Sequence, residues 1–238
     1  MKGRSGGLGS LPDSTAILDA LGRVRDPELD EPITDLGFVT DVEVGEGEVR
    51  VRLRLPTYFC APNFAYLMVA DARAAIQSVP GAGRAEIVLE DHHDAERINA
   101  GVAEGVGFAG IYGGEAAGGL DELRLVFRRK AYLARQERLA RSLLDAGRTV
   151  EQLADMGIGE LPDTDEARVY LQRREELGLD VGPEAFLLVD PAGVRVPADR
   201  VVATLRFAQT VRISIEGNAS FCRGMLATRY GLPTPAPK

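Results

Sequence analysis

The apolar positions between residues 13 and 94 follow two periods, one typical of helices and one typical of strands. Spacing of three or four residues predicts helices, whereas alternation or a β-rich composition predicts strands. Asp13 or Ser14 can cap the first helix, the two strands of a hairpin flank Gly-Glu-Gly, and Pro62 suits the first turn of the second helix. The predicted elements are a helix at about 14–24, strands at about 38–44 and 48–55, a helix from Pro62 to about 78, and a strand near 84–90. The expected order is therefore α-β-β-α-β around a small mixed sheet.

This order predicts where chemically active residues meet. A right-handed crossover through the second helix should leave the second and third strands parallel, so that both end at the same edge of the sheet. Cys60 follows the second strand, and Asp-His-His-Asp at 91–94 follows the third. We therefore expect these two segments to face each other and to form a site.

The stretch from 95 to 119 is rich in glycine, and we interpret it as a connector. Its GVGFAG matches G-x-G-x-x-G at Gly105, Gly107 and Gly110. A dinucleotide site needs a strand before this motif and a helix after it, and the sequence predicts neither. A connecting loop is the better interpretation.

Residues 120–230 are expected to form a second, mostly helical domain, so the chain as a whole belongs to the α/β (α+β) class. A long charged helix begins at LDELRL, and shorter ones are predicted at TVEQLADMGI and DEARVYLQRREELGL. FLLVD and VRISI have the composition of strands flanking a helix near 198–208, and Cys222 falls on a later helix. The ends, 1–12 and 231–238, are expected to be flexible tails.

The amino-acid composition excludes several classes of function. The chain has 238 residues, 45% of them hydrophobic, which is ample for a globular core. A net charge of -8 opposes binding to nucleic acid, and no apolar run is long enough for a membrane span or a secretory signal, so we expect a cytoplasmic protein. Two cysteines in such a chain are expected to be free thiols rather than a disulfide framework.

The segments DPELDEPITDLGFV and LPTYFCAP resemble the SufT/PaaD-like family of metal-sulfur cluster assembly proteins, over a domain that we place at 13–94. The shared marks are Asp26, Pro27, Glu28, Asp35, Leu36, Gly37, Thr57 and Cys60. The resemblance implies a maturation factor without catalytic activity that binds iron or a labile iron-sulfur cluster. The implied partners are a client iron-dependent enzyme or the cluster-assembly machinery. The longer layout is similar to proteins associated with soluble di-iron monooxygenases, which implies a multicomponent iron monooxygenase as client.

Cys60 is the expected metal ligand. A thiolate beside a helix N-terminus is stabilised by free N–H groups and by the helix dipole. His92 and His93 are the only histidines, and imidazole with thiolate suits iron or zinc, although neighbours in a strand point to opposite faces. Secondary candidates, as ligands or supporting residues, are Asp26, Glu28, Asp35, Thr57, Asp91 and Cys222.

One cysteine does not hold a cluster, because most clusters take about four ligands. The remaining ligands are expected from a second chain, a partner, small thiols, or nearby histidines and carboxylates. A homodimer would let two copies of Cys60 share the cargo.

Other interpretations stay open at this point. Cys60 and Cys222 are also explained as small buried core residues. The family domain would equally serve as a metal-free chaperone or adaptor for an oxygenase. A thiol enzyme would use Cys60 as nucleophile and His92 or His93 as base.

Overall fold

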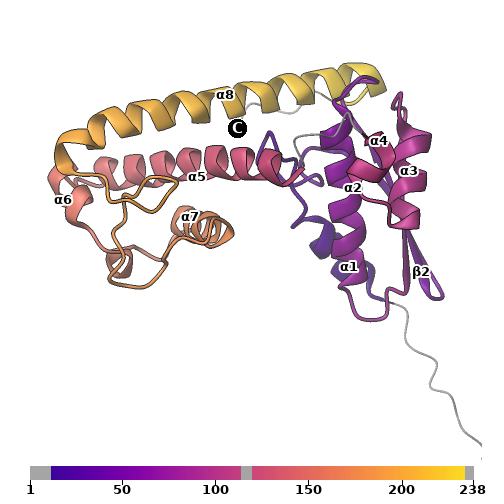
Figure 1. Cartoon of the computed structure of the whole chain (residues 1–238), viewed down its shortest axis with the longest axis horizontal. Coiled ribbons are helices and arrows are strands. Elements are labelled where there is room, and N and C mark those ends of the chain that lie inside the picture. Colours follow the sequence, from indigo (N-terminus) through magenta and orange to yellow (C-terminus); the bar gives the residue numbers. More distant parts are fainter. Residues whose placement is uncertain (1–11, 114–119, 234–238) are drawn as a thin grey trace, which may run out of the picture. The chain divides into compact units, whose positions relative to one another are not determined.

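The computed structural model describes residues 12–113 and 120–233, so most of the expected N-terminal and C-terminal tails lies outside the described residues. The chain divides into two compact units (Figure 1). The first comprises Met1–Leu120 together with Ala219–Lys238, and the second comprises Asp121–Asn218. The end of the chain therefore folds with the N-terminal unit, whereas we expected everything from 120 to 230 in the second domain.

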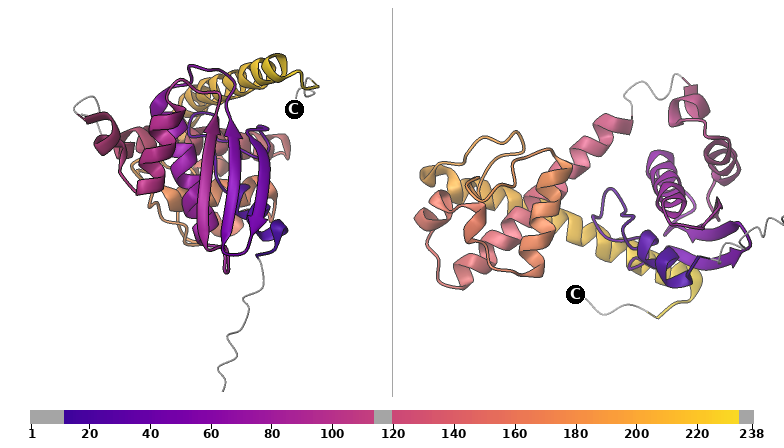
Figure 2. Two further views of the ribbon diagram at one scale, coloured as in Figure 1. Left: turned by 90° about the vertical axis from the view of Figure 1, so that its right-hand side faces the viewer. Right: turned by 90° about the horizontal axis from the view of Figure 1, so that it is seen from below.

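The first unit has the predicted α-β-β-α-β order. Its elements are α1 (Ser14–Leu21), β1 (Val39–Gly45), β2 (Glu48–Arg54), α2 (Pro62–Gln77) and β3 (Arg84–Glu90). The sheet order is β1-β2-β3, with β1 antiparallel to β2 and β2 parallel to β3. The left view of Figure 2 shows the three strands side by side. The predicted parallel pair is thus confirmed, and its two strands are immediate neighbours.

Strand alternation sorts the residues of β2 and β3 onto two faces of the sheet. One face buries Val49, Val51 and Leu53 of β2, with equivalent apolar side chains of β3, in the core that α1 and α2 also join. The other face carries ion pairs between the two strands, such as Arg50 with Glu86 at 2.7 Å. The helices therefore cover one side of the sheet, and this core fixes the register of β2 against β3.

The glycine-rich stretch that we expected to be a loop is mostly helical in its described part, with a short turn at 105–107. It forms α3 (Ala95–Glu104) and α4 (Phe108–Tyr112), while 114–119 lie outside the described residues. Gly105 ends α3 in the left-handed conformation at φ 74°, and Gly101 lets Ile111 approach because a Cβ there would overlap the Ile111 side chain. These glycines thus serve helix ends and close packing. The element before the G-x-G-x-x-G match is a helix, so the strand that a dinucleotide site needs is missing there.

The second unit is mostly helical, as predicted. It contains α5 (Leu120–Asp145, apart from its first residue), α6 (Val150–Asp155), a 3-10 turn (Ile158–Glu160), α7 (Asp165–Glu176) and the first part of α8 (Ala198–Tyr230). No helix in the described ranges 12–113 and 120–233 is long and apolar enough to cross a membrane.

The two strands predicted in this unit are wrong. The carbonyl groups of FLLVD accept hydrogen bonds from side chains of α5 and α7: Tyr132 and Gln136 donate to Val189 O, both at 2.8 Å, and Tyr170 donates to Leu187 O at 2.6 Å. Side chains thereby satisfy the backbone that a neighbouring strand would otherwise pair with.

VRISI lies inside α8. Its Arg212 pairs with Glu216 one helical turn away at 2.7 Å and with Glu137 of α5 at 2.5 Å. The first of these contacts requires helical spacing. The β-like composition of the segment therefore does not decide its structure, because it lies within a helix of 33 residues.

Candidate functional site

The candidate site lies where the parallel strands β2 and β3 end. His92 Nε2 lies 2.7 Å from the carbonyl oxygen of Cys60, and the backbone N–H of His93 donates to Tyr58 O at 3.0 Å. The segments after β2 and β3 therefore touch, as the predicted topology required. Two backbone carbonyls of the cysteine loop are anchored to the histidine segment.

His92 supports the cysteine loop through both of its ring nitrogens. It is buried, at 4% exposure, and its Nδ1 accepts a hydrogen bond from the backbone N–H of Asp94 at 3.1 Å. Because a carbonyl oxygen only accepts, Nε2 must carry the proton that is donated to Cys60 O. Burial lowers the pKa of His92, which favours this neutral form. In this arrangement His92 positions Cys60, and neither nitrogen is free to bind a metal.

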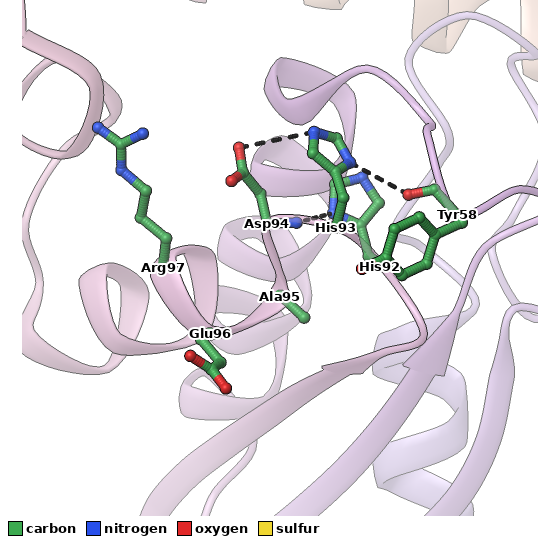
Figure 3. A pocket seen from close by; sticks show the side chains of 7 residues that line it. All are labelled: Tyr58, His92, His93, Asp94, Ala95, Glu96 and Arg97. Atoms are coloured by element: carbon green, nitrogen blue, oxygen red, sulfur yellow. Dashed lines mark hydrogen bonds and ion pairs between the residues drawn. The ribbon is translucent and has the colours of Figure 1, made fainter.

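His93 is placed differently, on the exposed side of the same segment. Its Nδ1 lies 3.1 Å from Tyr58 O and therefore donates to it, while Nε2 lies 3.8 Å from the Asp94 carboxylate (Figure 3). In the neutral ring, Nε2 keeps a lone pair, and a backbone carbonyl on the other nitrogen is how metal-binding histidines are usually oriented. The side chains around it line an open pocket of about 620 Å³, namely Tyr58, His92, His93, Asp94, Ala95, Glu96 and Arg97.

The Cys60 thiol is half-buried, just before the N-terminus of α2. Sγ lies 3.3 Å from Thr57 Oγ1, within hydrogen-bond distance for sulfur. The two preceding side chains are strongly exposed, Tyr58 at 48% and Phe59 at 76%, and their rings meet edge to face with centroids 5.0 Å apart. A reachable thiol thus sits beside an exposed aromatic pair.

Asp26 holds the turn of the Asp-Pro-Glu signature. Its Oδ1 accepts the backbone N–H groups of Glu28 at 2.8 Å and Leu29 at 2.9 Å. The carboxyl is buried, and this burial raises its pKa to about 6 despite these hydrogen bonds. Asp35 is exposed and accepts a hydrogen bond from Thr34 at 3.4 Å.

The end of α8 contributes residues that the sequence did not indicate. Arg229 donates to Leu55 O at 3.3 Å and to Asp91 O at 2.8 Å, so one guanidinium bridges the residues that follow β2 and β3. Tyr230 donates to the Asp91 carboxylate at 3.3 Å. An arginine at the end of a charged helix carries no local signal of such contacts, since they depend on how the chain returns to the first unit.

Cys222, also on α8, lies in the same neighbourhood. Burial raises the pKa of its thiol to about 12, with further contributions from the charges of Asp26, Cys60 and Glu28. The structure thus brings Cys60 and His92 into contact, and Cys222 packs against the same hydrophobic core as Cys60. Within residues 12–113 and 120–233, no three side chains among Cys, His, Asp and Glu are arranged to hold a metal ion.

These features define a class of protein: a small α+β domain that presents a braced, reachable thiol where two parallel strands end. A family model described as "Iron-sulfur cluster assembly protein" matches residues 14–88. An uncharacterized protein of Methanocaldococcus jannaschii is 34% identical over 84 residues, which are 35% of this chain and 86% of that protein. The chain belongs to the iron-sulfur cluster assembly protein family.

Further relatives are much longer proteins. Proteins named iron-sulfur cluster carrier protein, from Mycobacterium bovis and Mycobacterium tuberculosis, are each 36% identical over 85 residues. The match covers 35% of this chain and 22% of each mycobacterial protein. The family model ends at residue 88, so the histidines at 92 and 93 and all of α8 lie beyond it.

Proposed function

We propose that this protein binds iron or an iron-sulfur cluster at Cys60 as a labile cargo and delivers it to a client metalloenzyme. The observation that carries the proposal is the Cys60 loop, in which His92 Nε2 holds the backbone carbonyl at 2.7 Å while the cysteine stays partly exposed. A carrier needs a ligand that is positioned in advance and yet reachable by the acceptor. The names of the mycobacterial relatives support the same role.

The chemistry of the thiol favours a carrier over a thiol enzyme. A general base would have to accept the proton of Cys60 Sγ. His92 instead donates its Nε2–H to the carbonyl of the same residue, so it does not act on Sγ in this arrangement. Thiolates suit iron and its clusters, and His93 Nε2 offers an imidazole nearby.

The cargo is held incompletely by one copy of this site, which makes it transferable. Clusters take about four ligands, and Cys60 supplies one. We propose that the cluster-assembly machinery, the client, small thiols or a second copy of the chain complete the set. Thiols of this kind stay reduced in the cytoplasm, where we place the protein.

The client is proposed to dock over Tyr58 and Phe59. Exposed aromatic side chains are enriched in protein interfaces, and these two are adjacent to the cargo ligand in the chain. We propose a multicomponent iron monooxygenase as that client, which is the expectation from the sequence resemblance.

Anaerobic reconstitution with iron and sulfide tests the proposal. We expect the wild type to take up iron, with sulfide content separating a cluster from mononuclear iron, and to pass it to an apo-ferredoxin. Cys60→Ser should lose both iron uptake and transfer. His93→Ala should take up less iron if the His93 imidazole is a ligand. Equal uptake and transfer by Cys60→Ser would refute the proposal. The adaptor role would be established instead by two results together. The wild type would take up no iron, and Cys60→Ala would bind the client oxygenase as tightly as the wild type does.

A further inference from the structure

One side of α8 faces the edge of the first unit where β2 and β3 end. Cys222, Leu226 and Arg229 are spaced by four and then three residues, which places them on one side of a helix. Leu226 is buried, and its Cδ2 lies 3.5 Å from where a Cβ on Gly37 would be. Arg229 reaches the ends of β2 and β3. The side of α8 that carries Cys222 therefore packs on the family domain.

The two thiols border the same core. Cys60 and Cys222 are both half-buried, both free, and both packed against the hydrophobic cluster of the first unit. The neighbouring Arg223 forms an ion pair with Glu31, which follows the Asp-Pro-Glu turn, and so fixes this part of α8. Arg229, two helical turns after Cys222, reaches Asp91 O beside His92, and His92 in turn contacts Cys60 O at 2.7 Å. The thiols thus lie in one neighbourhood beside that turn.

We propose that Cys60 and Cys222 form a dithiol site that binds a thiophilic metal, either Fe²⁺ or an iron of a cluster. Binding converts two S–H groups into two metal–thiolate bonds and releases two protons to solvent. The two thiolates replace water molecules on Fe²⁺, or two terminal ligands on an iron of a cluster, and these leave with the protons. Two ligands from one chain leave about two of roughly four positions for an acceptor, so the cargo can leave by ligand exchange. The identity of the cargo rests on the proposed function, whereas the pairing of the thiols does not.

The pairing gives the C-terminal extension a chemical role. Cys222 lies outside residues 14–88, which the family model matches. The second ligand would therefore be a feature of this longer chain rather than of the family domain alone.

Proximity of the thiols can be measured on the wild-type chain. Dibromobimane becomes fluorescent when both of its arms alkylate thiols, and this chain has only two cysteines. We expect one fluorescent intrachain link per monomer in the wild type, and none in Cys60→Ser, Cys222→Ser or the cysteine-free double variant. Modification of the wild type by two separate molecules, without an intrachain link, would overturn the proposal.

Metal binding is tested by anaerobic titration with Co²⁺, whose near-ultraviolet absorption reports thiolate ligands. The wild type should bind one Co²⁺ per chain. Cys60→Ser and Cys222→Ser should each bind at least tenfold more weakly, with a smaller thiolate band per cobalt. Cys222→Ala, which adds no hydroxyl to the half-buried position, should weaken binding equally while circular dichroism stays unchanged.

The outcomes separate this inference from the proposed function. Co²⁺ binding that is lost in Cys60→Ser but unchanged in both Cys222 variants would overturn the dithiol site and leave Cys60 as a carrier ligand. Co²⁺ binding through both thiols, in a protein that neither loads nor transfers iron, would support the dithiol site and refute delivery.

Discussion

His92 donates a hydrogen bond of 2.7 Å from its Nε2 to the carbonyl oxygen of Cys60, a residue 32 positions earlier in the chain. The bond exists because β2 and β3 are parallel neighbours that end together. Through this bond His92 supports the cysteine loop, whereas metal binding by this histidine stays a prediction. The thiol itself remains half-buried and reachable.

Replacing His92 with alanine should lower the free energy of unfolding by about 1–3 kcal/mol, because the partly buried Cys60 O loses its donor and the buried imidazole is removed from its packing. His93→Ala is the matched control, since His93 is exposed and its removal should cost about 0.5 kcal/mol or less. Urea unfolding of both variants measures the difference. Equal losses would contradict the supporting role of His92.

Asp26 should make the protein less stable as the pH rises from about 4 to 6. Its pKa is about 6 in the folded protein and 3.8 when unperturbed, so the folded state binds more protons across this window. Two pKa units correspond to about 3 kcal/mol, lost as Asp26 ionises in its buried turn.

Asp26→Asn tests this, because it keeps an oxygen that can accept from Glu28 and Leu29 but carries no charge. At pH 7 the variant should be more stable than the wild type by up to about 3 kcal/mol. The gain should vanish below pH 3.8. The lowered pKa of His92 acts in the opposite direction, since that ring charges on unfolding as the pH falls, but it affects both proteins equally. A difference that does not change with pH would contradict the assignment.

Phe59→Ala should slow delivery without weakening the fold. The side chain is 76% exposed, so its removal should change the free energy of unfolding by no more than about 0.5 kcal/mol. If a client docks there, transfer from loaded protein should slow while iron uptake stays normal. Val194→Ala, at 63% exposure in the second unit, is the control. Unchanged transfer in Phe59→Ala would remove this surface from the docking site.

Gly83 should tolerate alanine much less well than Gly47. Both have positive φ, 65° and 77°. A Cβ on Gly83 would overlap the backbone of Gly47, whereas a Cβ on Gly47 would meet nothing within 4 Å. Gly47→Ala should therefore cost about 1 kcal/mol of backbone strain, and Gly83→Ala clearly more, because β3 must move away from the hairpin turn. Thermal unfolding ranks the two variants, and equal melting temperatures would contradict this close approach.

The sequence by itself determined the elements of the family domain. Apolar alternation and helical spacing located β2, α2 and β3 to within about one residue of their observed bounds, and the crossover made β2 and β3 parallel. That topology was enough to bring Cys60 and the histidine segment together. The elements follow from local patterns and the pairing from a general rule of crossover handedness, so both can be derived from the order of residues along the chain.

The tertiary structure decided what sequence patterns express only weakly. FLLVD and VRISI have the composition of strands. Side chains from α5 and α7 donate hydrogen bonds to the backbone carbonyls of FLLVD, and VRISI lies in α8, where Arg212 pairs with Glu216 one helical turn away. The role of His92 depended on which acceptor lay within 3 Å of its ring. The end of α8 packs on the first unit, where Arg229 reaches Asp91 after β3 and Cys222 borders the hydrophobic core, and these are long-range contacts. Such contacts arise from packing between distant parts of the chain, so no local pattern records them.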